Sequence, residues 1–193
     1  MNRWKIKIQL VLILFFLSFA IIFCSAQEFE VLNGSKMEIH GSSNVNQFTC
    51  IFPTNQIKPI QVDFNPDQLL FTKAEIKLPV ASFDCGGHGI NRDFKDLLQE
   101  KNHPNVKINL HKIDLHSSSE AKIHMTLEIA GIKNKYQLPV SYQKSNNRFQ
   151  ADATLPLNIE DFNLKQPRRL FGLIIVHKEI DIAFDLNFRS IKN

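Results

Sequence analysis

The feature that most constrains this chain is an alternation of apolar and polar residues with a period of two, which recurs from residue 37 to residue 188. Successive side chains of a β-strand point to opposite faces, so this pattern is typical of strands that bury one face and expose the other. The alternation predicts strands over residues 37–41, 48–52, 57–64 (the weakest), 70–80, 106–115, 123–129, 136–142, 149–157 and 180–188.

Short polar segments separate several of these strands. Residues 117–120, 131–134 and 145–147 have the length and composition of hairpin turns, which make consecutive strands antiparallel neighbours. One helix is predicted over Asn91–Lys101, with Asn91 capping its start and Pro104 beyond its end. A shorter helical turn is expected at 159–162.

About eight strands that are each polar on one side can bury their apolar sides in two ways. They form either a two-sheet sandwich or a closed barrel, and the alternation is compatible with both. A barrel of about eight strands is either filled by its own side chains or holds one small ligand. These alternatives stay open at the level of the strand pattern.

The N-terminal residues have the organisation of a secretory signal peptide. Three basic residues, Arg3, Lys5 and Lys7, precede an apolar run over residues 10–23, and small residues follow at 24–26. We therefore expect a signal peptide at 1–26 and one domain at 27–193, exported to the periplasm or secreted. A retained anchor is the alternative, but the apolar run is shorter than the about 20 residues of a membrane span.

Charge argues against nucleic acid as a partner. The chain has 23 basic and 19 acidic residues, and removing the three basic residues of the leader leaves 20 against 19. A nearly neutral domain lacks the basic surface that nucleic-acid binding requires. No nucleic-acid partner is expected.

Two cysteines, Cys50 and Cys85, remain after the leader. In an oxidising compartment such a pair is typical of a disulfide, and two buried free thiols or a metal or redox site with His88 are the alternatives. The seven histidines show no zinc-site spacing, and no Gly-x-Ser-x-Gly nucleophile motif occurs. We therefore expect no metal, no cofactor and no enzymatic activity.

Several segments, in their order along the chain, resemble the YceI-like domain family. They are the opening strand pair at 37–48, Arg92-Asp93 with the amphipathic helix after it, residues 103–108, the glycine-centred hairpin at 130–140 and the final strand at 179–188. The resemblance extends from about residue 32 to residue 188. The chain departs from better-known members at Cys85-Gly86-Gly87 and at Asn109, which is typical of a divergent branch with its own disulfide.

The resemblance implies an all-β fold, namely an antiparallel lipocalin-like β-barrel of about eight strands with one flanking α-helix. It also implies an exported protein that carries or sequesters a long apolar ligand, such as a polyisoprenoid or a fatty chain. The alternative is a structural or interaction barrel at the cell envelope, with a packed core and no ligand. Candidate ligand-contacting residues on the inward-facing positions are Ala74, Ile76, Met125, Leu127, Phe149, Ala151, Ala153, Phe184 and Phe188.

The segment 168–176 has two interpretations. Arg168 and Arg169 are candidates for binding a phosphate or carboxylate head group, with the apolar run 170–176 contacting a membrane transiently during loading. Alternatively, the run is a strand buried on both faces and the arginines are solvated. The exposed wall of a barrel would also permit a homodimer.

Overall fold

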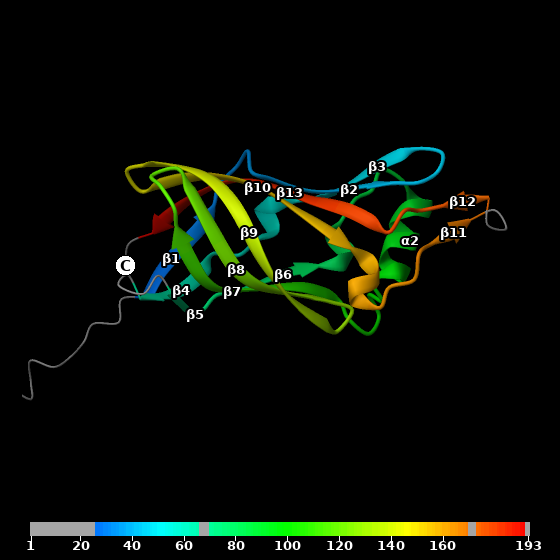
Figure 1. Ribbon diagram of the computed structural model, residues 1–193, viewed down its shortest axis with the longest axis horizontal. Helices are drawn as coiled ribbons and strands as arrows, with labels where there is room; N and C mark the ends of the chain where they lie inside the picture. The colour runs from blue at the N-terminus through cyan, green and yellow to red at the C-terminus, as the bar shows by residue number, and fades with distance from the viewer. Residues whose placement is uncertain (1–25, 66–69, 170–172, 192–193) are drawn as a thin grey trace, which may run out of the picture.

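The structure is a computed structural model that describes residues 26–65, 70–169 and 173–191 (Figure 1). The predicted signal peptide lies almost entirely outside the described residues. The strands are β1 (Ala26–Val31), β2 (Lys36–Ser42), β3 (Gln47–Phe52), β4 (Ile60–Asn65), β5 (Leu70–Lys73), β6 (Glu75–Pro79), β7 (Asn105–Leu115), β8 (Glu120–Ile129), β9 (Ile132–Ser145), β10 (Arg148–Asn158), β11 (Arg168–Arg169), β12 (Ile174–Ile175) and β13 (Glu179–Ile191). The helices are α2 (His88–Leu97) and the short 3-10 helices η1 (Thr54–Gln56), η2 (Val80–Ser82) and η3 (Ile159–Phe162).

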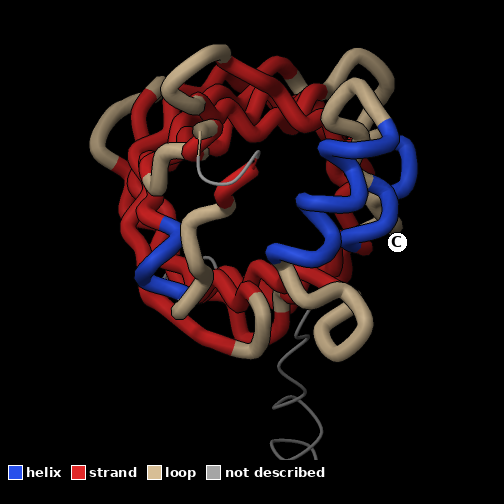
Figure 2. The backbone as a smooth tube through the Cα atoms, turned by 90° about the vertical axis from the view of Figure 1, so that its right-hand side faces the viewer, coloured by secondary structure: helices blue, strands red, loops and turns tan. Residues whose placement is uncertain are grey.

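The long strands close into an antiparallel barrel, which Figure 2 shows end-on. Pairing runs β1–β4–β5–β7–β8–β9–β10–β13, and β13 pairs back to β1, so the ring is complete. Toward the α2 end, the ring is continued by three short strands: β2 follows on from β1, β3 from β4 and β6 from β5. The ring therefore has eight strand positions. The predicted lipocalin-like barrel of about eight strands with one helix is confirmed.

The structure corrects several local expectations. The strand expected over 70–80 is broken at Ala74 into β5 and β6, and β1 was not predicted. Helix α2 begins at His88, after Gly87 as its N-cap, so the predicted capping role of Asn91 is wrong. Asn91 lies inside the helix, where its Oδ1 accepts the N–H of Cys85 (2.6 Å) and its Nδ2 donates to Asp84 Oδ1 (3.0 Å).

The disulfide Cys50–Cys85 is confirmed, and it joins β3 to the segment that leads into α2. Next to it, Ile51 and Asp84 exchange two backbone hydrogen bonds of 2.8 and 3.0 Å. The hydrogen bond from Asn91 holds the pKa of the Asp84 carboxyl below its ordinary value. Covalent and polar contacts therefore fix the helix to this end of the barrel.

The α2 end of the barrel has a compact apolar core. Phe83 packs between Phe52 and Phe94, and its ring centroid lies 5.0 Å from that of Phe52 and 5.1 Å from that of Phe94. Leu98 is also buried in this core. Buried side chains from the facing strands complete this core: Leu78, Val106, Ile108, Leu127, Ile129, Leu138, Leu155 and Ile182. Such close packing leaves no room for a guest in this half of the interior.

The wall has a seam between β9 and β10, which diverge toward the α2 end (Figure 1). The two strands pair only from Ser145↔Arg148 to Ser141↔Asp152. The Tyr142 N–H donates to the Ser119 carbonyl (2.8 Å), on the β8 side of the strand. Because the backbone N–H and C=O groups of successive residues point to alternate sides of a strand, the backbone groups of Ser141 and Pro139 point toward β10. Since proline has no N–H to donate, the ladder ends there.

Pro156 faces the same seam from β10. The Ile159 N–H donates to the Lys178 carbonyl on the β13 side (2.9 Å). By the same alternation, the backbone N–H and C=O groups of the even-numbered residues of β10 point toward β9. Beyond the end of β10, the seam is closed by η3. Its Phe162 is 1% exposed and stacks on Tyr136, with the ring centroids 6.3 Å apart. Apolar packing therefore replaces backbone hydrogen bonds along this line.

Candidate ligand-binding site

The inward face of β10 and β13 forms one continuous apolar wall. Phe149 lies opposite Phe188, Ala151 opposite Leu186 and Ala153 opposite Phe184. Opposite residues of an antiparallel pair share a face, so all six side chains point the same way. That face is the inside of the barrel, because its continuation toward α2 reaches Leu155 and Ile182, which are 4% and 8% exposed in the core.

Burial along this wall divides the interior into two halves. Leu155 and Ile182 are buried, whereas the inward-facing Ala151, Phe184 and Phe188 are only half-buried. An inward-facing apolar side chain that keeps accessible surface must border open space. The α2 half of the interior is therefore packed, whereas the apolar wall in the half next to β1 keeps accessible surface.

Three phenylalanines line the half next to β1. The rings of Phe149 and Phe188 stack at 5.2 Å, and Phe29 packs edge-on against them at 6.4 and 6.0 Å. Phe29 faces inward, since its partner Ser190 has the same parity on β13 as Phe188. This group, the Phe29–Phe149–Phe188 cluster, gives that mouth of the barrel an apolar lining.

The remaining candidate ligand contacts lie on β6, on β8 and at the break between β5 and β6. Met125 and Leu127 are 3% and 2% exposed and belong to the packed core. Ala74 is also buried, and its carbonyl accepts the N–H of Leu110 (2.9 Å). Ile76, opposite Ile108 on β7, is half-buried against the same core. The sequence-predicted set is thus divided between the packed half and the half that retains space.

The segment 168–176 lies at the α2 end, far from the Phe29–Phe149–Phe188 cluster (Figure 1). The backbone of Arg168 and Arg169 pairs with β12, but their side chains are outside what the structure describes, as are residues 170–172. The expectation of a strand buried on both faces is wrong for the described part. Leu173 is 73% exposed, and β12 contains only two residues.

Sequence reasoning missed a cation at the mouth. Lys144 lies opposite Phe149, on the inward face of β9, and its ammonium lies 5.4 Å from the centre of the Phe149 ring. Lys144 makes no ion pair among the residues that the structure describes. Next to it on the same face, the Tyr142 hydroxyl donates to the Ser117 carbonyl (3.1 Å).

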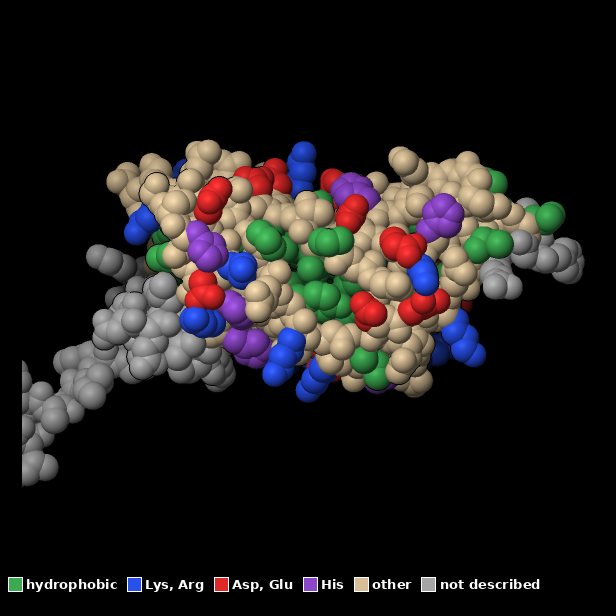
Figure 3. Space-filling model, viewed as in Figure 1, with side chains coloured by type: hydrophobic (Ala, Val, Ile, Leu, Met, Phe, Trp, Pro, Cys, Tyr) green, Lys and Arg blue, Asp and Glu red, His purple; other side chains and the backbone are tan. Residues whose placement is uncertain are grey.

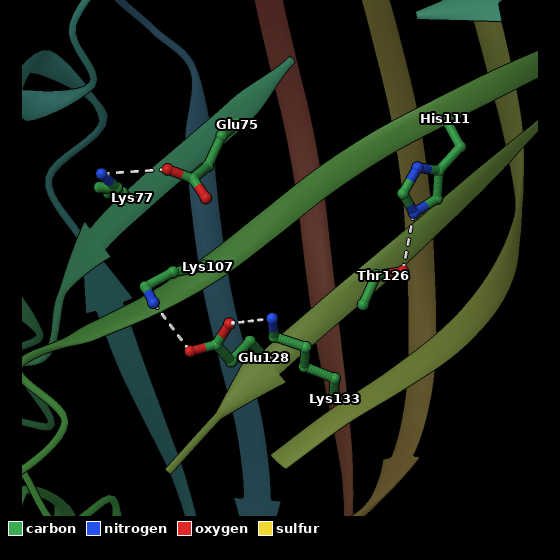
Figure 4. A network of polar contacts seen from close by, with 7 residues as sticks. All are labelled: Glu75, Lys77, Lys107, His111, Thr126, Glu128 and Lys133. Carbon is green, nitrogen blue, oxygen red and sulfur yellow. Dashed lines mark hydrogen bonds and ion pairs between the residues drawn. The ribbon is translucent and has the colours of Figure 1, made fainter. Parts of the chain in front are cut away.

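The outer wall, in contrast, carries paired charges. Lys107, Glu128 and Lys133 lie across β7, β8 and β9, with N–O distances of 2.8 and 3.5 Å from Glu128 to the two lysines (Figure 4). The hydrogen bond from Lys107 is the main reason that the pKa of Glu128 is lowered, and the same bond raises the pKa of Lys107. A charged exterior and an apolar interior are what a barrel in water requires.

Two hollows open on the outer wall. One, of about 570 Å³, borders the seam at Pro139 and Thr154. The other, of about 690 Å³, lies beside the β2–β3 hairpin and has the carboxylates of Asp161, Glu179 and Asp181 along it. Figure 3 shows hydrophobic side chains in the middle of the face on which β9 and β10 diverge.

Residues 26–65, 70–169 and 173–191 contain no group of three or more His, Cys, Asp or Glu residues placed to hold a metal ion. Within the same ranges, no helix has the length and hydrophobicity needed to cross a membrane. The strongest candidate site among the described residues is the inward wall formed by Phe149, Ala151, Ala153, Phe184, Leu186 and Phe188.

Comparison with solved structures identifies the class of fold. BcnA of Burkholderia cenocepacia superposes with a TM-score of 0.64 at 22% identity, covering 79% of this chain and 95% of that one. A polyisoprenoid binding domain from Saccharophagus degradans, implicated in plant cell wall breakdown, gives 0.66 at 16% identity, with 86% and 99% covered. The Campylobacter jejuni YCEI protein gives 0.56 at 16%, with 69% and 81% covered. At these identities the likeness establishes the fold alone.

Sequence comparison identifies the family. The YceI-like domain model matches residues 31–188, which is most of the chain. The protein belongs to the YceI-like domain family, as its segments at 37–48, 92–108, 130–140 and 179–188 indicated. None of the curated proteins searched matches the chain.

Proposed function

We propose that this protein is an exported binding protein that carries or sequesters a long apolar molecule, a polyisoprenoid or a fatty chain, inside its barrel. The observation that carries the proposal is the inward wall of β10 and β13, where apolar side chains remain half-buried although they face the interior. One of the structural neighbours is described as a polyisoprenoid binding domain, which supports the same ligand class.

The energetics of such binding are favourable. Burying one methylene contributes about 0.8 kcal/mol, so ten buried carbons supply about 8 kcal/mol, enough for micromolar affinity. The half of the barrel next to β1 offers Phe149, Ala151, Ala153, Phe184 and Phe188 as contacts. Met125 and Leu127, which are closed into the core, would support the wall without touching the ligand.

Export is part of the proposal. The basic and apolar N-terminal residues have the organisation of a signal peptide. The Cys50–Cys85 disulfide is the kind of bond that persists in oxidising compartments. We expect the mature chain to begin at Gln27, to need no cofactor and to catalyse no reaction.

The experiment expresses the full chain with its own leader and purifies it from the exported fraction. Mass spectrometry of an organic extract is expected to show a long-chain lipid at close to one per protein, and the delipidated protein is expected to take up a fluorescent fatty probe saturably. Absence of both the lipid and saturable uptake would refute a carrier and favour a packed structural barrel. Retention of residues 1–26 on a membrane-bound product would refute the cleaved leader.

A further inference from the structure

We infer that the mouth next to the β9–β10 turn binds the anionic head group of the ligand, so that the protein takes anionic long-chain amphiphiles in preference to neutral ones. Lys144 carries the inference, because its ammonium lies over the Phe149 ring at this mouth. The inference rests on the proposed function, because it concerns the head of the same apolar guest.

The position of Lys144 follows from the register of β9 and β10. Tyr142 lies opposite Ala151 and Lys144 lies opposite Phe149, so both β9 side chains leave the strand on its inward face. The Phe149 ring then holds the ammonium at 5.4 Å, at the edge of the Phe29–Phe149–Phe188 cluster. An ammonium over an aromatic face is attracted to it but stays free to donate hydrogen bonds to another group.

The charge of this mouth is unbalanced. Among the residues that the structure describes, Lys144 makes no ion pair, whereas Arg189 on the outer face is paired with Glu30 at 2.7 Å. Most other ion pairs of the wall join neighbouring strands or neighbours on one strand, such as Lys107–Glu128 and Lys77–Glu75. A cation at the rim of an apolar interior, with no carboxylate partner among the described residues, favours an anionic group there.

The opposite end of the barrel offers the apolar guest no comparable mouth. The hollow beside the β2–β3 hairpin carries Asp161, Glu179 and Asp181, with His40 the basic side chain that borders it. The core around Phe83 also closes this end to an apolar chain. The packed core therefore orients an amphiphile with its head at Lys144 and its tail along Ala151 and Ala153.

The test compares two ligands with the same chain and different heads. Dodecyl phosphate and 1-dodecanol each displace a neutral fluorescent probe from the full-length protein at low ionic strength. We expect the phosphate to bind about tenfold more tightly, the effect of one charge-assisted hydrogen bond at a partly exposed site. Inorganic phosphate alone is expected to displace nothing, because the chain supplies the binding energy.

Matched variants assign the preference to this mouth. Lys144→Gln is expected to reduce the preference to within twofold, chiefly by weakening the binding of dodecyl phosphate. Lys135→Gln, on the outer face of the same strand, is expected to keep the full preference. Equal binding of both ligands to the unmodified protein, or a full preference in Lys144→Gln, would overturn the head-group inference. Failure of both ligands to bind would instead refute the proposed function.

Discussion

Ala153→Phe tests whether the interior next to β1 holds space for a chain. Ala153 faces inward opposite Phe184, is half-buried and borders the hollow at the seam, so we expect space beside it for a bound chain. A new ring there would occupy the length of about four methylenes, whose loss costs about 3 kcal/mol, or about 200-fold in affinity. The free energy of unfolding should change by less than about 1 kcal/mol, because the ring enters open space.

Two assays on the same protein separate these effects: urea unfolding and displacement of a fluorescent fatty probe. Thr154→Phe is the matched control, since Thr154 is the next residue on β10, is exposed and faces outward. It is expected to leave probe affinity within twofold. If Ala153→Phe destabilises the protein by about 1–3 kcal/mol, the usual cost of overpacking a filled core, and still binds the probe normally, the reasoning is refuted.

Three further predictions concern the Cys50–Cys85 disulfide, the ion pair of Glu128 and the seam between β9 and β10. Replacing both cysteines of the Cys50–Cys85 pair by serine should cost about 4 kcal/mol in urea unfolding, from the lost constraint on a loop of 35 residues; an unchanged midpoint would contradict this. The pKa of Glu128 is lowered in the folded state, so the unfolded chain binds more protons in acid. The ionised Glu128 therefore stabilises the fold above the unfolded pKa, and this contribution is lost as the pH falls through the folded pKa. Glu128→Gln should therefore flatten the loss of stability below about pH 4.3, the ordinary value for Glu, and an unaltered pH profile would show that the ion pair contributes nothing. In hydrogen exchange, the Gln137 amide, which faces the seam, should exchange much faster than the Leu138 amide, which faces β8; equal protection would mean that the seam is paired.

The alternation predicted the strands because it records which side chains are excluded from water. It placed Ala151, Ala153 and Phe184 on the inward face, where the structure has them. It did not predict β1, in which only Phe29 and Val31 mark an apolar face and whose partners β4 and β13 are distant along the chain. Such short strands are defined by long-range pairing, which a local pattern does not record.

The seam and the mouth depend on register, which the sequence alone does not give. Pro139 and Pro156 are visible in the sequence, but only the pairing of β9 with β10 shows that they face one another's strand. Lys144 follows the last clear apolar residue of its strand, so nothing in the alternation marked it as inward-facing. The start of α2 was missed because Asn91 resembles an N-cap, whereas its side chain bonds the Cys85 N–H and Asp84.

Photolabelling with a diazirine-bearing fatty acid tests the central claim most directly, because it reports where a bound chain lies. With the full-length protein, the account predicts labels on inward residues of β10 and β13 between Phe149 and Phe184, suppressed by excess unlabelled fatty acid. Labels confined to the outer wall or to the α2 end, or labels that excess fatty acid does not suppress, would contradict it.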